Sequence, residues 1–402
     1  MADYDVTLSE ALMPGLLEQP TALGKLVESA LNQILEAQVR DHLGADRYER
    51  NDERVGYRNG SRPRQLYTRV GPITLQVPQT RDGSFSTEIF GRYQRSEQAF
   101  VLGLMEMVVN GVSTRKVTAI TEALCGAAFS KSTVSRLTVA LDERVGAFLK
   151  RDLDASYPFV LVDALFIKAR REERVFSRAA LIATGINANG SREIIGLAIG
   201  DVESYSTWNS LFSGLHDRGL RAVDFVVSDS HAGLAEAIAK NFAGATWQRC
   251  QVHLMRNLLG HASSKKRAEI ADAAKLIFGS QTITEARRHR DDFVKRFEKS
   301  APKVVACLED GFDDAMAVMV LPSRYRRRLR TTNMVERLNQ EVRRRERVIR
   351  IFPSDESALR MIGAVLAEQH EAWQERIYLD MADYHEWRAE RTTDSSGQER
   401  AA

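Results

Sequence analysis

The chain has 402 residues, of which 44% are hydrophobic and 28% are charged, and its formal net charge is +3. This composition excludes fibrous and wholly disordered chains, and the length allows two or three domains with a large core. No apolar run is long enough to span a membrane, and the first residues lack the basic and apolar segments of a secretory signal, so we expect a cytoplasmic protein without a membrane partner. The lack of paired cysteine spacing predicts reduced thiols at Cys125, Cys250 and Cys307.

The N-terminal part of the chain changes from a helical to a strand-like pattern. Residues 20–45 have a helical period, and the predicted apolar face carries Leu26, Ala30, Ile34 and Ala37. Residues 49–86 combine short alternating runs with turn residues, which predicts a small β-hairpin module. We expect five arginines of this module to be exposed: Arg54, Arg58, Arg62, Arg64 and Arg69.

Residues 96–148 return to a helical period, and residues 114–142 have the pattern of a helix-turn-helix. Ser130 is a favourable N-cap for the second helix. DNA-binding motifs of this kind present the start of the second helix to the major groove, although any two packed helices show a similar pattern. Candidate DNA contacts in the N-terminal part are therefore Arg58, Arg115, Lys116, Lys131, Ser132 and Arg136.

The central part of the chain alternates buried strands with amphipathic helices. The expected strands lie near residues 158–168, 175–186, 193–199, 223–228 and 245–249. Helices are expected at 232–242 and at 204–219, and the apolar face of the latter carries Trp208, Leu211, Phe212 and Leu215. The order βββαβαβα is that of a ribonuclease-H-like α/β core.

The rest of the chain is predicted to be mostly helical, with a helical insertion from Lys265 to about Met319 and a disordered polar tail from Asp394 to Ala402. We expect the following parts: an N-terminal helical region (1–48), a β-hairpin module (49–95), a helix-turn-helix region (96–150), the first part of the core (151–262), an all-helical insertion (263–325), the second part of the core with the helix of Glu336 (326–380), and a C-terminal tail (381–402).

Three acidic residues stand out by their surroundings. Asp163 lies inside an apolar strand, Asp229 follows another, and Glu336 lies in an arginine-rich helix. An ionised carboxylate among apolar residues is costly unless a cation or hydrogen-bond donors meet it. In the ribonuclease-H-like order the first and fourth strands are neighbours, so Asp163 and Asp229 would face each other. With Glu336 they would form a site for two Mg²⁺ ions, with Mn²⁺ as a substitute.

Each acid also has a structural explanation. Asp163 could be bonded to backbone amides, and Asp229 could cap the helix that follows it. Glu336 fits a capping box with Asn333. The position of the third acid has two rivals on the same helix, Glu341 and Glu346.

The segment Leu321–Arg350 contains eleven Arg and three Glu, a net charge of +8 in thirty residues. Such a run can be only a solvated face, but beside a carboxylate site it favours contact with DNA phosphates. The candidates for this role are Arg324, Arg326, Arg327, Arg328, Arg330, Arg337, Arg343, Arg344 and Arg345.

Several motifs together carry a family resemblance. Around the acids stand Asp163–Leu165, Ser228–Gly233, Trp247–Asn257 and Thr331–Asn339, and the N-terminal half contributes Gly56–Gly60, Val77–Phe85 and Gly111–Val117. Over roughly residues 50–376 the sequence resembles the Mutator-type bacterial insertion-sequence transposases.

The resemblance implies a DDE-type transposase in which Asp163, Asp229 and Glu336 are the metal ligands of a ribonuclease-H-like catalytic core. It implies recognition of double-stranded DNA, both the terminal inverted repeats and the target. Because two DNA ends must be joined to one target, we expect a homodimer or larger homo-oligomer, associated with the nucleoid when bound to DNA. Two other functions stay open: a non-catalytic helix-turn-helix DNA-binding protein derived from a transposase, and a structure-selective nuclease.

The family also carries a Cys-x-x-His pair, here Cys250 and His253. A zinc site would need two more soft ligands, and the sequence has no second such pair. We expect Cys250 to pack behind the acids and His253 to orient a carboxylate or touch DNA. His231 follows Asp229 closely, so it either reaches the phosphate or is an ordinary exposed histidine.

Overall fold

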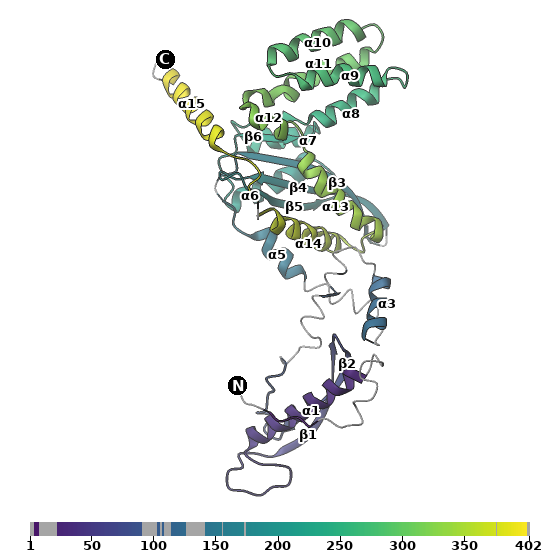
Figure 1. Cartoon of the computed structure of the whole chain (residues 1–402), viewed down its shortest axis with the longest axis vertical. Helices are drawn as coiled ribbons and strands as arrows, with labels where there is room; N and C mark the ends of the chain where they lie inside the picture. Colours follow the sequence, from purple (N-terminus) through teal and green to yellow (C-terminus); the bar gives the residue numbers. More distant parts are fainter. Residues whose placement is uncertain are drawn as a thin grey trace. The chain divides into compact units, whose positions relative to one another are not determined.

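The computed structural model describes residues 4–7, 22–90, 103–104, 107, 114–125, 141–154, 156–172, 174–374 and 376–399. The chain forms two compact units, Met1–Leu141 and Asp142–Ala402, which are described separately (Figure 1). The expected second helix of the helix-turn-helix, with Ser130, Lys131, Ser132 and Arg136, lies outside the described residues.

In the first unit a helix lies on a two-stranded antiparallel sheet. The elements are α1 (Ala22–Leu43), β1 (Arg58–Thr68), β2 (Gly71–Thr80) and α3 (Thr114–Cys125). Leu35 of α1 packs with Leu66, Ile73 and Leu75 of the sheet. The α1 side chains Glu28 and Asn32 accept hydrogen bonds from the β2 amides of Thr74 and Gln76, at 2.8 and 2.7 Å. The helix therefore also satisfies the edge of the sheet.

The apolar face of α1 differs from the expected one. The buried residues are Gly24, Leu35, Val39 and Leu43, with Val27 and Leu31 partly buried, whereas Leu26, Ala30, Ile34 and Ala37 are only half-buried. The predicted row is offset by one position because apolar residues cover more than one face of this helix. The sheet takes the row with more large aliphatic side chains, which buries more apolar area.

The exposure predicted for the hairpin arginines is wrong for three of the five. Arg62 and Arg69 are exposed, but Arg58 is half-buried and pairs with Glu36 at 2.8 Å. Arg54 donates to the carbonyl of Gly56 at 3.0 Å, and Arg64 stacks 4.3 Å from the ring centre of Phe90. A local carboxylate, carbonyl or ring is a closer partner for these guanidinium groups than solvent.

A five-stranded mixed sheet forms the centre of the second unit. Its strands are β3 (Phe159–Arg171), β4 (Arg174–Ile186), β5 (Arg192–Gly200), β6 (Phe225–Ser228) and β7 (Thr246–Arg249). The spatial order is β5-β4-β3-β6-β7, with β4 antiparallel to both β3 and β5 and with β6 parallel to both β3 and β7. The fold of this unit is therefore mixed α/β, and β3 is the central strand.

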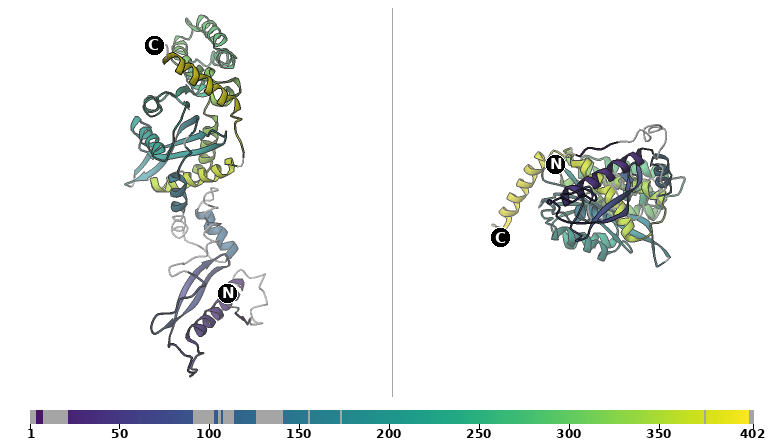
Figure 2. Two further views of the ribbon diagram at one scale, coloured as in Figure 1. Left: turned by 90° about the vertical axis from the view of Figure 1, so that its left-hand side faces the viewer. Right: turned by 90° about the horizontal axis from the view of Figure 1, so that it is seen from below.

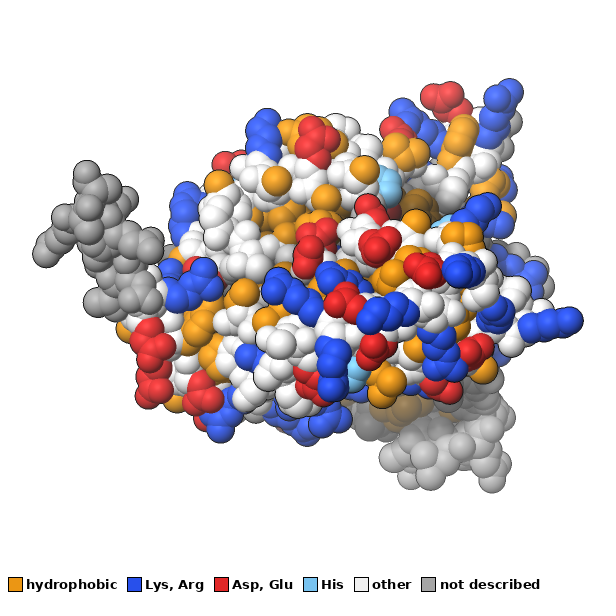
Figure 3. All heavy atoms as spheres, turned by 90° about the horizontal axis from the view of Figure 1, so that it is seen from above, with side chains coloured by type: hydrophobic (Ala, Val, Ile, Leu, Met, Phe, Trp, Pro, Cys, Tyr) orange, Lys and Arg blue, Asp and Glu red, His pale blue; other side chains and the backbone are white. Residues whose placement is uncertain are grey.

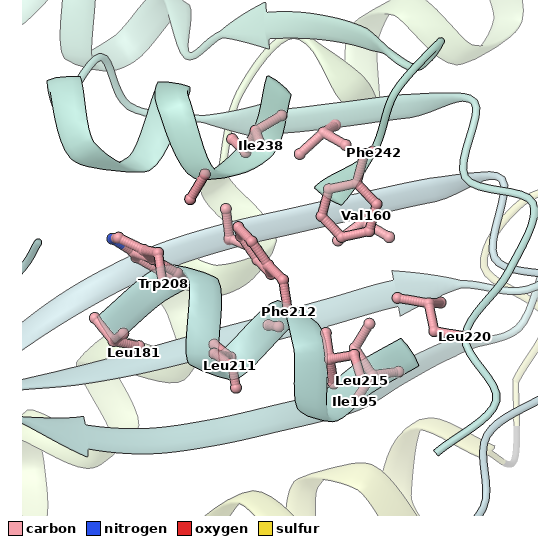
Figure 4. Packing of buried hydrophobic residues seen from close by; sticks show 14 of the residues in the cluster. Val160, Leu181, Ile195, Trp208, Leu211, Phe212, Leu215, Leu220, Ile238 and Phe242 are labelled. Atoms are coloured by element: carbon pink, nitrogen blue, oxygen red, sulfur yellow. The ribbon is translucent and has the colours of Figure 1, made fainter. Parts of the chain in front are cut away.

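Helices α6 (Tyr205–Asp217) and α7 (Ala232–Asn241) cover one face of the sheet (Figure 4). Ser204 caps α6 by accepting a hydrogen bond from the Thr207 amide, and Thr207 completes the capping box. As the helical spacing predicts, Trp208, Leu211, Phe212 and Leu215 are buried. These side chains bury the apolar face of α6 against strand residues such as Val160 and Leu181.

Helices α13 (Asn333–Ile349) and α14 (Asp355–Gln374) pack against strands β3 and β5. The His370 Nδ1 atom accepts a 3.3 Å hydrogen bond from the Ile194 amide of β5, and Arg178 of β4 donates to Asp355 at 2.9 Å. Helix α5 (Leu141–Lys150) lies on α14, where Gly363 leaves room for Val145. Of the helices in the described part of the chain, none is long and apolar enough to cross a membrane.

Between β7 and α13 the chain builds a helical layer with its own core. It consists of α8 (Gln251–His261), α9 (Arg267–Gly279), α10 (Ile283–Phe297), α11 (Pro302–Met316), η3 (Ala317–Val320) and α12 (Ser323–Leu329). Its core includes Leu254, Ile270, Phe293 and Phe312. Buried Gln248 of β7 joins it to the sheet by donating to the Ala315 carbonyl at 2.7 Å and accepting from the Val318 amide at 2.6 Å. The left-hand view of Figure 2 shows this layer at the top, and charges of both signs are interspersed on the face drawn in Figure 3.

Residues 394–399, which were expected to be disordered, are helical, because helix α15 extends over Ala382–Glu399. Tyr384 at its start is fully buried, with its ring 5.2 Å from that of Phe159, and its amide donates to the Tyr325 hydroxyl at 2.9 Å. This anchor orders the start of the helix, and a low apolar content further along does not prevent helix formation.

Candidate active site

The register of β3 and β6 determines where the first two acids lie. Leu161 pairs with Val227 in this parallel ladder. Asp163 and Asp229 each lie two residues further along, so both acids reach the same row of the sheet. The separation of 66 residues in sequence is closed by strand pairing, and Asp229 is one of the charges that act on Asp163.

The carboxylate of Asp163 is buried, with 7% of the residue exposed. Its Oδ1 atom accepts a hydrogen bond from the Ala164 amide at 3.0 Å, and its Oδ2 atom accepts one from Asn339 Nδ2 at 2.8 Å. Burial raises the pKa of Asp163 to about 7; His253 opposes this rise, while the charges of Asp229 and Glu336 add to it. The charges of two other carboxylates, Asp229 and Glu336, therefore act on the buried carboxyl group of Asp163.

Asp229 lies directly after β6, in the turn that leads into α7. Its Oδ1 atom accepts a 3.1 Å hydrogen bond from the amide of His231, which is the N-cap of α7. The side chain of His231 makes no capping hydrogen bond. The carboxylate of Asp229 thus stabilises the turn before α7 and is half-buried.

Glu336 is not engaged in the capping box that its sequence allows. Helix α13 has Thr332 as its N-cap, without a side-chain capping hydrogen bond. The Oε1 atom of Glu336 instead lies 3.8 Å from His253 Nε2 and 3.5 Å from a guanidinium nitrogen of Arg256, both on α8. The capping explanation for Glu336 therefore fails, and its carboxylate faces the residues around Asp163.

The two rivals of Glu336 have other surroundings. Glu341 forms ion pairs with Arg344 and Arg345, and these bonds, with that of Arg345 first, lower the pKa of Glu341. Burial raises the pKa of Glu346, and the nearest charges are Arg343 and Lys168. Glu336, by contrast, is among the charges that raise the pKa of Asp163.

Cys250 and Thr332 connect the starts of the two helices that flank the acids. Cys250 is fully buried, and its Sγ atom accepts hydrogen bonds from both the amide and the hydroxyl of Thr332, each at 3.4 Å. Burial alone would raise the pKa of the Cys250 thiol, but contacts with His253 and Thr332 outweigh it and lower this pKa. The same contact with Cys250 raises the pKa of His253. Cys250 thus contacts Thr332 at the start of α13, and His253 lies near Glu336, while the expected place of Cys250 behind the acids stays a prediction.

Two polar residues at this site were not expected from the sequence. Asn339 follows Glu336 by three residues on α13, so helical spacing could have placed it on the same face. Glu203 lies in the loop before α6, where no sequence signal marks it. Its side chain is 8% exposed, and its Oε1 atom accepts from Trp208 Nε1 at 3.1 Å and lies 3.9 Å from His231 Nδ1. Burial and the charge of Asp229 raise the pKa of Glu203.

The donors at this site suit a hard divalent cation in kind. They are carboxylates, joined by the Oδ1 atom of Asn339, which is buried beside Asp163 and has no hydrogen-bond partner. Within the described ranges, however, no three or more His, Cys, Asp or Glu residues lie close enough together to hold one ion. The carboxylates would have to draw closer around a cation.

Most of the arginines ahead of Glu336 have partners within the chain. Arg324 pairs with Asp380 at 2.9 Å, and Arg326 donates to the Leu321 carbonyl at 2.7 Å. Arg328 donates to the Tyr378 carbonyl at 2.6 Å, and Arg330 to that of Phe278 at 3.1 Å. These bonds connect α12 to its surroundings, and they leave the predicted role in DNA binding untested.

The exposure of the other arginine candidates varies. Arg327, Arg337, Arg343 and Arg344 are exposed, as is Lys116 on α3. Arg345 is 2% exposed, which contradicts its expected place on a phosphate-binding surface. Its guanidinium group is used by Glu341 of the same helix. Arg115 lies on α3, but its side chain is outside the described residues.

The site therefore combines Asp163 on β3, Asp229 directly after the neighbouring strand β6, and Glu336 on helix α13. A profile of the family described as "Transposase, Mutator family" matches residues 6–376. The chain therefore belongs to the Mutator family of transposases, as its motifs suggest.

Three relatives support this assignment. The transposase for insertion sequence element ISRM5 of Rhizobium meliloti is 42% identical over 94% of this chain and 96% of its own. The transposase of IS256 in transposon Tn4001 from Staphylococcus aureus is 44% identical over 87% and 90%. That of IS406 from Burkholderia multivorans is 37% identical over 92% and 97%. A solved Drosophila P element transposase strand transfer complex matches 74% of this chain and 83% of its own at 11% identity, with a TM-score of only 0.31.

Proposed function

We propose that this chain is the transposase of an insertion sequence, and that Asp163, Asp229 and Glu336 form its catalytic site for DNA cleavage and strand transfer. The observation that carries the proposal is the convergence of two charges on one buried acid: Asp229 and Glu336 both act on the carboxyl group of Asp163. Like charges are costly to bring together in a folded protein, so their convergence favours a functional role.

The sheet supports assignment to the ribonuclease-H-like class. Its order β5-β4-β3-β6-β7, with three antiparallel strands followed by two parallel ones, agrees with the order expected for that fold. The acids lie on the central strand, after its parallel neighbour, and on a helix that packs on the central strand. The helical layer α8–α11 between β7 and α13 corresponds to the expected insertion.

Each side chain of the site has a defined part in the proposal. Asp163, Asp229 and Glu336 would hold two Mg²⁺ ions, or Mn²⁺ as a substitute. Such ions when bound activate an attacking oxygen and stabilise the leaving oxygen of a phosphodiester. Asn339 orients Asp163 through its hydrogen bond, and His253 and Arg256 lie beside Glu336 and hold its carboxylate toward the site. Cys250 and Thr332 fix the start of the helix that carries Glu336.

Two successive reactions would use the same residues. Water first cleaves a strand at the end of the element, which leaves a free 3′-hydroxyl. That hydroxyl then attacks a phosphodiester of the target, so that one phosphodiester bond forms as another breaks. No covalent protein intermediate is needed, and the three acids suffice for both steps.

The N-terminal unit is the proposed reader of the terminal inverted repeats. Arg62 and Arg69 of the hairpin and Lys116 of α3 are exposed there. Contacts with phosphates position a protein on DNA, whereas a helix in the major groove can read base edges. Two ends joined to one target require two sets of acids, so the proposed active species is a homodimer or larger oligomer on double-stranded DNA.

The test is a reaction of the purified full chain with DNA that carries both ends of its source element and a supercoiled target plasmid. We expect strand cleavage and joined products with Mg²⁺ or Mn²⁺, and neither with EDTA. Cleavage without joining would identify a nuclease instead. Equal product yield in EDTA would contradict the carboxylate mechanism.

A further inference from the structure

Two arginines contact the ring of one tyrosine on the second unit. The guanidinium carbon of Arg192, at the start of β5, lies 5.0 Å from the ring centre of Tyr378 and 4.3 Å from that of Trp373. The guanidinium carbon of Arg328, on α12, lies 4.5 Å from the same Tyr378 ring. Three segments distant in sequence thus form a cluster of alternating rings and guanidinium groups, which we call the guanidinium ladder.

Two further arginines add to the positive charge of the ladder. Burial lowers the pKa of Arg192; Tyr378 opposes this change, and the charges of Arg337, Arg328 and Arg376 reinforce it. The positive charges of three other guanidinium groups therefore act on that of Arg192. Arg328, Arg337 and Arg376 are exposed to solvent.

Among the described residues, no ion pair with a carboxylate involves Arg192, Arg328, Arg337 or Arg376. Glu375 is adjacent in sequence but lies outside the described residues. Four arginines against that single acid still leave a net charge of +3. Repulsion of this kind is relieved when an anion binds.

Holding the chain together does not account for all four residues. The segment after α14 is already attached by its backbone, because the amides of Tyr378 and Leu379 donate to the Gly190 carbonyl at 2.9 and 3.0 Å. Gly190 has φ of +83°, and a side chain there would meet the Leu379 carbonyl at 1.8 Å. The charges of Arg376 and Arg337 repel that of Arg192, so they do not strengthen this attachment.

The chemistry of the ladder matches a polyanion with regularly spaced phosphates. Ring contacts orient the guanidinium groups of Arg192 and Arg328, and Arg328 also donates one N–H to the Tyr378 carbonyl. Guanidinium N–H groups that are not used in this way can bind phosphate oxygens. Arg337 also follows the proposed catalytic Glu336 directly in sequence. A DNA strand that passes along α13 would reach both.

We propose that the guanidinium ladder, formed by Arg192 and Arg328 at Tyr378 and extended by the nearby charges of Arg337 and Arg376, binds the phosphate backbone of the DNA on which this transposase acts. The proposal rests on the proposed function, because it names a contact surface for the same substrate. Its partner is double-stranded DNA, contacted without regard to base sequence. Its role is to position the strand, and none of its residues touches the reacting phosphate.

The test measures binding rather than reaction. The full chain is titrated onto a fluorescent 30-base-pair duplex of mixed sequence in EDTA, at several NaCl concentrations, and the dissociation constant is plotted against salt on logarithmic axes. Each lost phosphate contact should reduce the slope by about 1. We expect Arg376→Gln to weaken binding about three- to tenfold with this loss of slope, and Arg192→Gln with Arg376→Gln to lose about 2.

Controls separate this role from folding. Arg376 is exposed, so Arg376→Gln should keep the wild-type melting temperature even if Arg192→Gln does not. Lys299→Gln, an exposed cation between α10 and α11, should leave slope and affinity unchanged. An unchanged slope in folded Arg376→Gln and in the double variant overturns the proposal, and a loss of self-association at unchanged slope assigns the ladder to a second copy of the chain. Neither outcome bears on the catalytic acids, because EDTA prevents any role of a metal in this assay.

Discussion

Asn339 donates a buried hydrogen bond of 2.8 Å to Asp163, from a position one helical turn after Glu336. Helix α13 therefore supplies one acid of the site and orients another. The Oδ1 atom of the same Asn339 amide is buried without a hydrogen-bond partner. Such an arrangement is costly in a resting protein and becomes favourable when a cation or a donor enters the site.

Replacement of Asn339 by Leu should impair cleavage without impairing DNA binding. The change keeps the volume but removes the donor to a carboxylate, and a hydrogen bond to a charged group contributes about 1.5–3 kcal/mol. We expect roughly a 10- to 100-fold slower cleavage rate at saturating DNA and metal. Gln340→Leu, at the exposed neighbouring position, is the matched control and should retain the wild-type rate. A full rate for Asn339→Leu would show that Asp163 needs no such support.

Asp163→Asn should stabilise the metal-free protein at pH 7. The pKa of this carboxyl group is about 7 in the folded protein and near 3.8 when unfolded. At a pH between these two values the group is protonated in the folded protein and loses its proton on unfolding. Its contribution to stability therefore falls as pH rises from about 4 to 7. Asparagine does not titrate, so the variant does not lose stability in this way. Because its side chain can accept only one of the two hydrogen bonds that Asp163 accepts, we expect a net gain in the free energy of unfolding of about 1–3 kcal/mol.

The measurement for Asp163→Asn is urea unfolding in EDTA at pH 5 and pH 7. The gain should be larger at pH 7 than at pH 5, and the exposed control Asp272→Asn should show neither effect. A variant less stable than wild type at both pH values would mean that hydrogen bonds, rather than burial, dominate at Asp163.

His370 should make the second unit sensitive to mild acid. Burial lowers the pKa of His370 to about 4, with the charge of Arg151 adding to the shift. Because the unfolded imidazole takes up a proton near pH 6.5, stability is lost as pH falls from about 6.5 toward 4. We expect His370→Gln to lose less stability over this range than wild type, by about 1–2 kcal/mol after allowance for solvent screening. Parallel pH–stability curves for the two proteins would refute this role.

The sequence contains enough information for the core but not for the local environment of its acids. Strand β4, helix α6 and the acids Asp163 and Asp229 follow from apolar runs and helical spacing, because burial and period determine these elements directly. The partner of Asp163 does not, because Asn339 lies 176 residues away and the choice of partner depends on how α13 docks. The burial of Glu203 could not be predicted either, because it depends on how the loop before α6 packs in the folded protein.

The surroundings of the arginines could not be predicted from the sequence either. Net charge along Leu321–Arg350 predicts a basic segment, but it cannot distinguish an arginine that faces solvent from one that binds a carbonyl. Arg345 is buried beside Glu341, whereas Arg337 is exposed on the same helix. Likewise the apolar face of α1 shifts by one position, because the docking of the sheet selects among several apolar rows.

The central claim is that three carboxylates carry the chemistry, and the most direct measurement compares Asp163→Asn, Asp229→Asn and Glu336→Gln with Glu341→Gln on DNA carrying the source element's ends. The amides keep shape but remove charge, so the first three should lose cleavage by about 1000-fold or more and bind the DNA within about threefold of wild type. Glu341→Gln should cleave normally. Wild-type cleavage by Glu336→Gln, together with loss in Glu341→Gln, would contradict this account of the site.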